Sequence, residues 1–312
     1  MRVLVTGAAG FVGAHLLRLL CAPGHEPHAL ILPGEKLAPE FGAIPVRRAS
    51  VVEFEALRGL FAAIRPDWIV HLAAISRPAD CRAKPALAWE VNFLGTRNVF
   101  AAAAEASPEA RVLFVGSAAE YGRPATGAPI TEESPLEPAD IYAATKVAGD
   151  LLGAEFAREK GLAVLRVRPF NHTGPGQDVG FVAPDFARQI ARIEAGLQEP
   201  RMTVGNLDAR RDFTDVRDVV RAYLLVLEQG VPGAVYNISS GRTVSARDIL
   251  DGLLALSSAK PEVTSRPGAP DTLTGSSELL RTATGWKPEI PLSRTLSDLL
   301  SDWRERVAAE RR

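Results

Sequence analysis

The sequence predicts an α/β fold in which a doubly wound parallel sheet is followed by a smaller, mixed C-terminal domain. Apolar runs of strand length alternate with longer helical segments through the first half of the chain, as in a parallel sheet covered on both faces. A glycine-rich stretch separates the first expected strand from the first expected helix. After Pro169 the alternation loosens, and prolines separate helices from short strands. This order is typical of a Rossmann fold.

Strands and helices are expected to alternate along the chain. The strand-like runs are residues 2–6, 28–32, 44–47, 68–72, 112–115 and 164–167, and the helical segments between them are residues 12–20, 54–64, 89–106 and 142–160. Beyond them we expect a Gly/Pro turn region at residues 171–179, a helix at 184–196 and a buried strand at 235–238. Ligands of open parallel sheets bind beyond the carboxyl ends of the strands, so we expect the cleft at that edge, under the C-terminal part.

Composition excludes several classes of protein. The chain has 312 residues, 46% hydrophobic and 23% charged, which suits a soluble globular protein. Its formal net charge of -1 gives no general attraction to nucleic acid or to an anionic membrane. Cys21 and Cys81 are too few for a disulfide framework or a metal-ligand cluster, so a reducing cytoplasm fits best and no metal is expected. With no leader-like or membrane-spanning apolar run, we expect neither secretion nor membrane insertion.

Residues 7–13, Gly-Ala-Ala-Gly-Phe-Val-Gly, predict a dinucleotide-binding turn. Glycines allow the tight turn and the close approach of a pyrophosphate, and the following helix directs its unpaired N–H groups at the anion. The choice between NAD and NADP stays open, because Glu35 could meet a ribose hydroxyl and Lys36 could meet a 2′-phosphate, while both could also be plain loop charges.

Tyr142 and Lys146 stand four residues apart in an expected helix, so the phenol and the ammonium share one face. A neighbouring cation favours phenolate, which moves a tyrosine from its usual pKa near ~10 toward a useful acid or base. Together with the glycine turn and Ser117, this pair favours proton-coupled hydride transfer over a surface pair of residues.

Several motifs carry a resemblance to a known family. They are Thr-Gly-Ala-Ala-Gly-Phe-Val-Gly at 6–13, His-Leu-Ala-Ala at 71–74, Asn92 with Gly95 and Thr96, Ser117 ahead of Tyr121 and Gly122, and Tyr142 with Lys146. Over nearly its whole length the chain resembles the extended short-chain dehydrogenase/reductases that act on nucleotide-activated sugars. Within that family, Arg-Pro-Phe-Asn-His-Thr-Gly-Pro-Gly-Gln at 168–177 and Val-Gly-Asn-Leu-Asp-Ala-Arg-Arg-Asp-Phe-Thr-Asp at 204–215 resemble the reductases of GDP-4-keto-6-deoxy-mannose, which make GDP-rhamnose.

The resemblance implies a role for each matching residue. Tyr142 would be the general acid, Lys146 would hold the nicotinamide ribose and lower the tyrosine pKa, and Ser117 would hydrogen-bond the sugar oxygen at C4. Asn171 and Arg211 would contact the phosphates of the nucleotide sugar, and Arg266 would lie near its ribose. The implied contacts of the NADP or NAD cofactor are Gly7, Gly10, Phe11, Val12, Gly13, Ser50, Val51, Leu72, Ala73, Ala74, Asn92, Tyr142, Lys146 and Pro169.

The resemblance also implies two domains and an assembly. Residues 1–168 plus about 213–243 would form the dinucleotide-binding domain, and residues 169–212 and 244–312 the nucleotide-sugar domain. Helices 89–106 and 142–160 are rich in alanine and would pair with their copies in a homodimer as a four-helix bundle, although packing against the sheet explains the same faces.

The chain departs from relatives in the family at two places. Sugar 4,6-dehydratases carry an acid and a base directly after the Ser/Thr, where this chain has Ala118 and Ala119, so dehydration is disfavoured. Glu120 comes one place late and, on a strand-like path, would face the opposite way. Ser50 and Val51 stand where the family often has an aspartate that contacts adenine, which weakens the expected grip on that base.

The leading hypothesis is therefore NAD(P)H-dependent reduction of a GDP-4-keto-6-deoxy-hexose. A UDP-sugar 4-epimerase with tightly bound NAD is the alternative, since it shares Ser117, Tyr142 and Lys146; a dehydratase or a non-catalytic dinucleotide sensor ranks lower. His28, His71 and His172 lack ligand spacing and are interpreted as structural, with a role for His172 near the nucleotide as a minor alternative. Motif spacing does not determine the nucleotide base, the product stereochemistry or NADPH over NADH.

Overall fold

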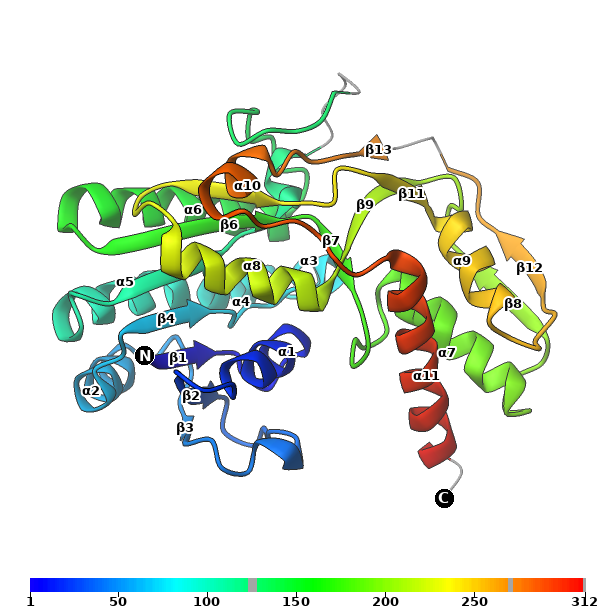
Figure 1. Cartoon of the computed structure of the whole chain (residues 1–312), viewed down its shortest axis with the longest axis horizontal. Coiled ribbons are helices and arrows are strands. Elements are labelled where there is room, and N and C mark those ends of the chain that lie inside the picture. Colours follow the sequence, from blue (N-terminus) through cyan, green and yellow to red (C-terminus); the bar gives the residue numbers. More distant parts are fainter. Residues whose placement is uncertain (123–127, 269–271, 311–312) are drawn as a thin grey trace.

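The computed structural model describes residues 1–122, 128–268 and 272–310 (Figure 1). Its centre is a parallel sheet of seven strands in the order β10-β6-β5-β4-β1-β2-β3. These strands are β1 (Arg2–Thr6), β2 (Glu26–Ile31), β3 (Val46–Arg48), β4 (Trp68–His71), β5 (Arg111–Val115), β6 (Ala163–Pro169) and β10 (Val235–Ile238). The order reverses at β1, which pairs with both β2 and β4, and ligands of such sheets bind at this switch point. The expected doubly wound fold is confirmed.

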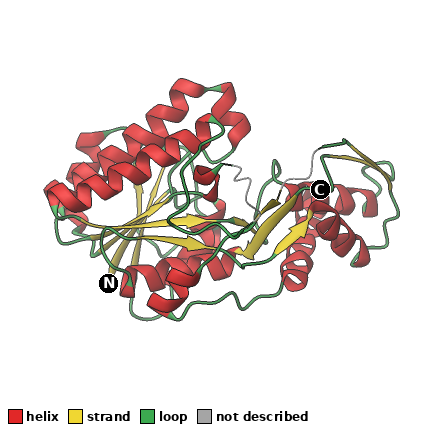
Figure 2. Ribbon diagram, turned by 90° about the horizontal axis from the view of Figure 1, so that it is seen from above, coloured by secondary structure: helices red, strands yellow, loops and turns green. Residues whose placement is uncertain are grey.

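Helices cover both faces of this sheet (Figure 2). One face packs against α1 (Phe11–Leu20), α8 (Val216–Gln229) and α10 (Glu278–Thr284) through a core that includes Val3, Leu16 and Val219. The other face packs against α2 (Phe54–Ile64), α5 (Gly95–Ala106) and α6 (Ile141–Lys160) through a core that includes Leu4, Phe61 and Phe100. Because the strands are buried on both faces, they read as continuous apolar runs rather than as alternating patterns.

The C-terminal part has a separate core and small sheets beyond the carboxyl ends of the central strands (Figures 1 and 2). Its helices are α7 (Val182–Glu194), α9 (Ala246–Ala255) and α11 (Leu292–Glu310), and α11 packs along α7. In one small sheet β9 (Arg210–Asp215) pairs with β7 (Asn171–Thr173), β11 (Thr243–Ser245) and β13 (Thr272–Leu273); in another, β8 (Arg201–Val204) pairs with β12 (Glu262–Ser265). Short elements complete the chain: η1 (Pro39–Phe41), α3 (Pro78–Ala83), α4 (Pro85–Trp89), η2 (Glu90–Leu94) and η3 (Ala118–Tyr121).

Two sequence predictions about elements were wrong. The expected helix at 89–106 is divided, because α4 ends at Trp89 and a π-helical turn, η2, precedes α5. Such turns occur frequently at functional sites, and this one carries Asn92. The expected turn region at 171–179 begins instead with the strand β7, whose pairing partner β9 is remote in sequence. The other expected elements are present with ends shifted by at most a few residues.

The described ranges contain neither a membrane-spanning helix nor a cluster of metal ligands. Within residues 1–122, 128–268 and 272–310, no helix combines the length and apolar character needed to cross a membrane. Over the same ranges, no three His, Cys, Asp or Glu side chains gather in a way that could hold a metal ion.

Candidate active site

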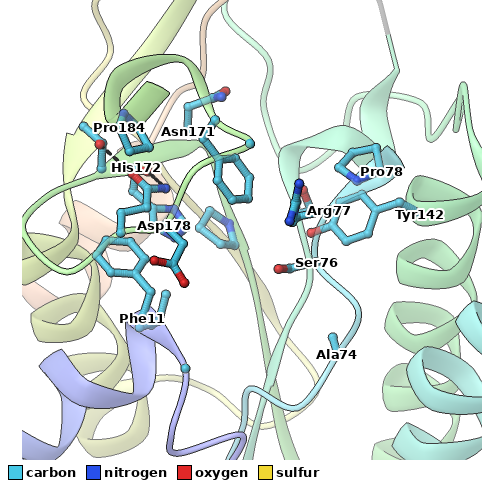
Figure 3. Close-up of a pocket in the computed structure, with 18 of the residues that line it drawn as sticks. Phe11, Ala74, Ser76, Arg77, Pro78, Tyr142, Asn171, His172, Asp178 and Pro184 are labelled. Carbon is cyan, nitrogen blue, oxygen red and sulfur yellow. Dashed lines mark hydrogen bonds between the residues drawn. The ribbon is translucent and has the colours of Figure 1, made fainter. Parts of the chain in front are cut away.

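A large cleft lies at the carboxyl ends of the central strands, as expected from the sheet topology. Its lining comes from the turn after β1, the loops after β4, β5 and β6, the start of α6, and α7 and β9 of the C-terminal part. Figure 3 shows Phe11 and His172 on one wall and Ser76, Arg77 and Tyr142 on the opposite wall. The cleft thus lies between the sheet edge and the C-terminal part.

The glycine turn at residues 7–13 forms the floor of the cleft below α1. Gly7 has a φ of +66°, and a Cβ there would lie 2.7 Å from the backbone nitrogen of Ala73. A Cβ on Gly13 would lie 2.5 Å from the carbonyl oxygen of Ala8, so only glycine permits this close packing of helix on strand. Gly10 begins α1 without a side-chain cap, which leaves helix N–H groups for an anion. The turn therefore suits the pyrophosphate of a dinucleotide.

The other expected cofactor contacts lie along the same cleft, with one exception. Ser50, Val51, Leu72, Ala73, Ala74 and Pro169 line it, as do Phe11 and Val12. The Asn98 amide holds the backbone at Val51 by donating to its carbonyl oxygen at 3.2 Å. Glu35 lines the cleft and accepts a hydrogen bond from the Leu32 N–H at 2.8 Å, whereas Lys36 is not part of the lining. Of the two charged residues in the loop after β2, Glu35 is therefore the one that lies at the cleft.

Asn92 is the exception, because it does not line the cleft and is 2% exposed. Its Oδ1 accepts from the Ile75 N–H at 2.7 Å, and its Nδ2 donates to the Ile75 carbonyl at 3.1 Å and to the Thr145 hydroxyl oxygen at 3.1 Å. These bonds use both ends of the amide. Asn92 therefore ties the loop after β4 to α6. The structure does not place its side chain in the cleft, where the sequence led us to expect a direct contact with the cofactor.

Ser117, Tyr142 and Lys146 meet at the cleft from two elements. Tyr142 and Lys146 lie in the first turns of α6, whose N-cap Asp140 accepts from the Ala143 N–H at 2.9 Å. Ser117 is the N-cap of η3, and its side chain lies close enough to the Tyr142 phenol to lower the pKa of that group. The Lys146 ammonium donates to the Val115 carbonyl at 2.8 Å and lies 5.5 Å from the centre of the Phe114 ring. The expected catalytic residues are therefore together.

The electrostatics of this group differ from the sequence expectation. Burial raises the pKa of Tyr142 to about 12, and the contact with Ser117 offsets only part of that rise. Burial lowers the pKa of Lys146 to about 8, against the attraction of Glu120. The Tyr142 pKa is therefore raised rather than lowered as expected, because desolvation of the phenolate outweighs the contact with Ser117, and the nearby Glu120, Cys81 and Asp140 add to the rise. A tyrosine that keeps its proton is suited to act as a proton donor.

The expected substrate residues separate into two groups. Asn171 and Arg211 line the cleft, and Figure 3 shows Asn171 on the wall opposite Tyr142. Arg266 is exposed outside the lining, and its backbone N–H donates to the Val204 carbonyl at 3.1 Å. Its segment follows β12 and lies beside Val204 and Asn206, which do line the cleft.

His71 is buried outside the lining of the cleft, whereas His172 is part of that lining (Figure 3). His71 is buried between the hydroxyl oxygens of Thr6 at 2.8 Å and Thr96 at 3.0 Å. Burial, reinforced by the charge of Lys146, lowers its pKa to about 3, so the ring is neutral. His172 stacks on Phe11 with ring centres 6.4 Å apart, and its Nδ1 lies 3.0 Å from the Phe170 carbonyl oxygen. Phe11 and His172 thereby join the glycine turn to the loop after β6.

Sequence reasoning missed Ser76 and Arg77, which line the cleft beside Tyr142 (Figure 3). The Arg77 guanidinium lies against Gly180, where a Cβ would come within 2.7 Å of its Nε. The available signal was their position directly after the His-Leu-Ala-Ala motif. The expected strand-like path at Glu120 was wrong, because residues 118–121 are 3₁₀-helical, but the side chain does face away from the cleft, as expected, and is buried against Ser117.

Comparisons with known proteins agree with this geometry. Residues 3–239 match the NAD dependent epimerase/dehydratase family. Over 315 residues, 99% of each chain, the sequence is 38% identical to GDP-6-deoxy-D-mannose reductase of Pseudomonas aeruginosa. The structure of RMD from Pseudomonas aeruginosa complexed with NADPH has a TM-score of 0.88 and 37% identity, covering 98% of this chain and 99% of that one. UDP-glucose 4-epimerase of Thermus thermophilus in complex with NAD has a TM-score of 0.86 and 28% identity, covering 97% of this chain and 99% of that one.

Proposed function

The chain belongs to the NAD dependent epimerase/dehydratase family, and we propose that it reduces the C4 ketone of GDP-4-keto-6-deoxy-mannose to GDP-rhamnose with NAD(P)H. The observation that carries the proposal is the contact of Ser117 with Tyr142 at the cleft, in a chain similar over 99% of its length to a GDP-6-deoxy-D-mannose reductase. We further propose that residues 1–168 with about 213–243 bind the dinucleotide, and that residues 169–212 and 244–312 bind the nucleotide sugar.

The cofactor supplies the hydride, and the residues of this chain manage the proton and the developing charge. Hydride transfer to a ketone places negative charge on its oxygen. Tyr142, whose pKa is raised by burial, would donate its proton to that oxygen, and the Ser117 hydroxyl would donate a second hydrogen bond to it. Lys146, one turn after Tyr142 on the same face of α6, would hold the nicotinamide ribose. Asn171 and Arg211 would face the phosphates, and guanidinium geometry suits that role.

Dehydration is disfavoured by the residues next to Ser117. Ala118 and Ala119 have no group that could act as acid or base, and Glu120 is turned into the protein interior. Epimerisation at C4 would use the same Ser117, Tyr142 and Lys146, and the similarity to UDP-glucose 4-epimerases keeps it as the second candidate.

The proposal is tested by NADPH and NADH oxidation with GDP-4-keto-6-deoxy-mannose generated in the cuvette, with the product identified by NMR. We expect oxidation that yields GDP-rhamnose. Tyr142→Phe should lower kcat by at least about 100-fold, as for loss of a general acid, while cofactor Kd stays near that of wild type. Tyr236→Phe is the matched control, because that buried hydroxyl accepts the Val231 N–H at 3.0 Å outside the cleft.

The outcomes separate the two candidates. Absence of oxidation by a protein that binds the cofactor would refute the reductase, and conversion of UDP-glucose without net cofactor consumption would then establish the epimerase. Full activity of Tyr142→Phe would refute the assigned proton donor. Comparison of NADPH with NADH determines the cofactor preference. Glu35, at the tip of β2, lines the cleft and is the acid that could meet a ribose hydroxyl.

A homodimer through α5 and α6 and their copies is also part of the proposal. Exposed apolar side chains lie on this side of the molecule: Leu87 is 40% exposed, Trp89 40%, Leu94 46% and Leu151 57%. Burial of such a patch favours association.

Cys21 and Cys81 are free thiols, which supports the proposed cytoplasmic location.

A further inference from the structure

Glu120 is a buried carboxyl group next to the catalytic residues that the proposed reaction does not use. It is the third residue of η3, and its side chain is fully buried. Its Oε1 accepts from the Ser117 N–H at 2.8 Å, while the Ser117 hydroxyl oxygen accepts from the Ala119 N–H at 3.1 Å. This reciprocal pair is a capping box. The carboxylate thus fixes the backbone of Ser117.

The space for this carboxylate is provided by Gly116. A Cβ on Gly116 would lie 2.3 Å from Glu120 Oε1, so any other residue there would displace the carboxylate from the Ser117 N–H. Gly116 itself is tied to β6, because its N–H donates to the Val167 carbonyl at 2.8 Å. The segment before the catalytic serine is therefore shaped to admit the Glu120 side chain.

A buried arginine lies on the other side of Glu120. The Arg168 Nε is 3.0 Å from Glu120 Oε2. This contact is electrostatic rather than a hydrogen bond, because the same Nε donates to Asp150 Oδ2 at 3.1 Å. Arg168 also donates to Asp150 Oδ1 at 3.0 Å and to the Tyr121 hydroxyl at 2.9 Å, and its guanidinium lies 5.1 Å from the centre of the Tyr121 ring. Glu120 is thus held between Arg168 and the Ser117 turn.

The charge of Glu120 acts on the catalytic pair. Burial and the Asp150 carboxylate raise the pKa of Glu120, while Arg168 and the Ser117 N–H lower it. Burial and Asp150 outweigh these contacts, so the net pKa of Glu120 is raised to about 8. Burial lowers the pKa of Lys146, and Glu120 opposes that change. Glu120 likewise adds to the rise in the pKa of Tyr142 that burial causes.

We propose that Glu120 is a positioning residue for the reduction, holding Ser117 in the turn that places its side chain beside Tyr142. This inference rests on the proposed function and extends it to a residue that does not touch the substrate. Other charged and titratable groups of the cluster are Asp150, Arg166 and Arg168 on α6 and β6, Tyr121 on η3 itself and Glu132 from the loop before α6. They are unchanged in the variants below.

The test compares Glu120→Gln, Glu120→Ala and wild type. The amide oxygen of glutamine can still accept from Ser117 N–H, so Glu120→Gln removes mainly the charge, whereas Glu120→Ala removes both the charge and the acceptor. We expect kcat to fall by about 3- to 10-fold in Glu120→Gln and by about 10- to 100-fold in Glu120→Ala, with substrate KM and NADPH Kd within about 3-fold of wild type.

The matched control is Asp248→Asn. Asp248 forms the same kind of capping box at the start of α9, where it accepts from the Ser245 N–H at 2.8 Å, and it does not line the cleft. Its replacement should leave kcat unchanged. If Glu120→Ala does not fold, as seen by circular dichroism, Glu120→Gln still decides the question.

The outcomes distinguish this inference from the proposed function. A wild-type kcat in Glu120→Gln would overturn the inference while leaving the reductase intact. If wild type fails to reduce the GDP-linked ketone, the variants are compared in UDP-sugar epimerisation, which would use the same Ser117 and Tyr142.

Discussion

Replacement of Lys146 by methionine should change how stability depends on pH. The ammonium of Lys146 is 7% exposed, and burial lowers its pKa from 10.5 to about 8. That difference corresponds to about 3 kcal/mol of unfavourable burial of the charged form, at about 1.36 kcal/mol per pKa unit. Below pH about 8 both folded and unfolded chains carry the proton, so the cost is present in full.

Between pH about 8 and 10.5 the unfolded chain binds more protons at this group than the folded chain, so the contribution of Lys146 to stability becomes less unfavourable as pH rises. The free energy of unfolding of wild type, relative to Lys146→Met, should therefore increase by up to about 3 kcal/mol across that window. Urea unfolding measured at a series of pH values tests this expectation. Lys160→Met, which removes an exposed lysine of the same helix, is the matched control. Parallel curves for wild type and Lys146→Met would refute the reasoning.

Two further predictions concern the glycine turn and the apolar surface. Gly13→Ala, whose Cβ would lie 2.5 Å from the Ala8 carbonyl oxygen, should lower the free energy of unfolding by about 2 kcal/mol or more and weaken NADPH binding in calorimetry. Gly59→Ala, with no atom within 4 Å of the new Cβ, should instead stabilise α2 by about 0.5–1 kcal/mol, and equal effects of the two would contradict the packing argument. Leu151→Glu, at a side chain 57% exposed on α6, should shift light scattering toward a monomer mass, whereas Leu256→Glu, 43% exposed on another surface, should not. A monomeric wild type would contradict the proposed dimer.

Much of the fold was predictable because its signals are local. The strand at residues 2–6 has the predicted bounds, since a continuous apolar run followed by a glycine turn specifies a buried strand and the start of a helix. Tyr142 and Lys146 lie on one helix face because the period of an α-helix places them there. The division of the helix at 89–106 was not predictable, since the π-helical turn contains Asn92, whose amide bonds the backbone of Ile75.

The sequence by itself predicted the doubly wound sheet, the glycine turn, and Ser117, Tyr142 and Lys146 as candidate catalytic residues. Neighbouring residues and short spacings carry that information. Only the tertiary structure decided the direction of the tyrosine pKa and the placement of Glu120. The Tyr142 pKa depends on how much water the folded chain removes from the phenol. The placement of Glu120 depends on Arg168, which comes from a different strand and is itself fixed by Asp150 of α6. Desolvation and contacts between distant elements exist only once the chain has folded, so no pattern of neighbouring residues contains them.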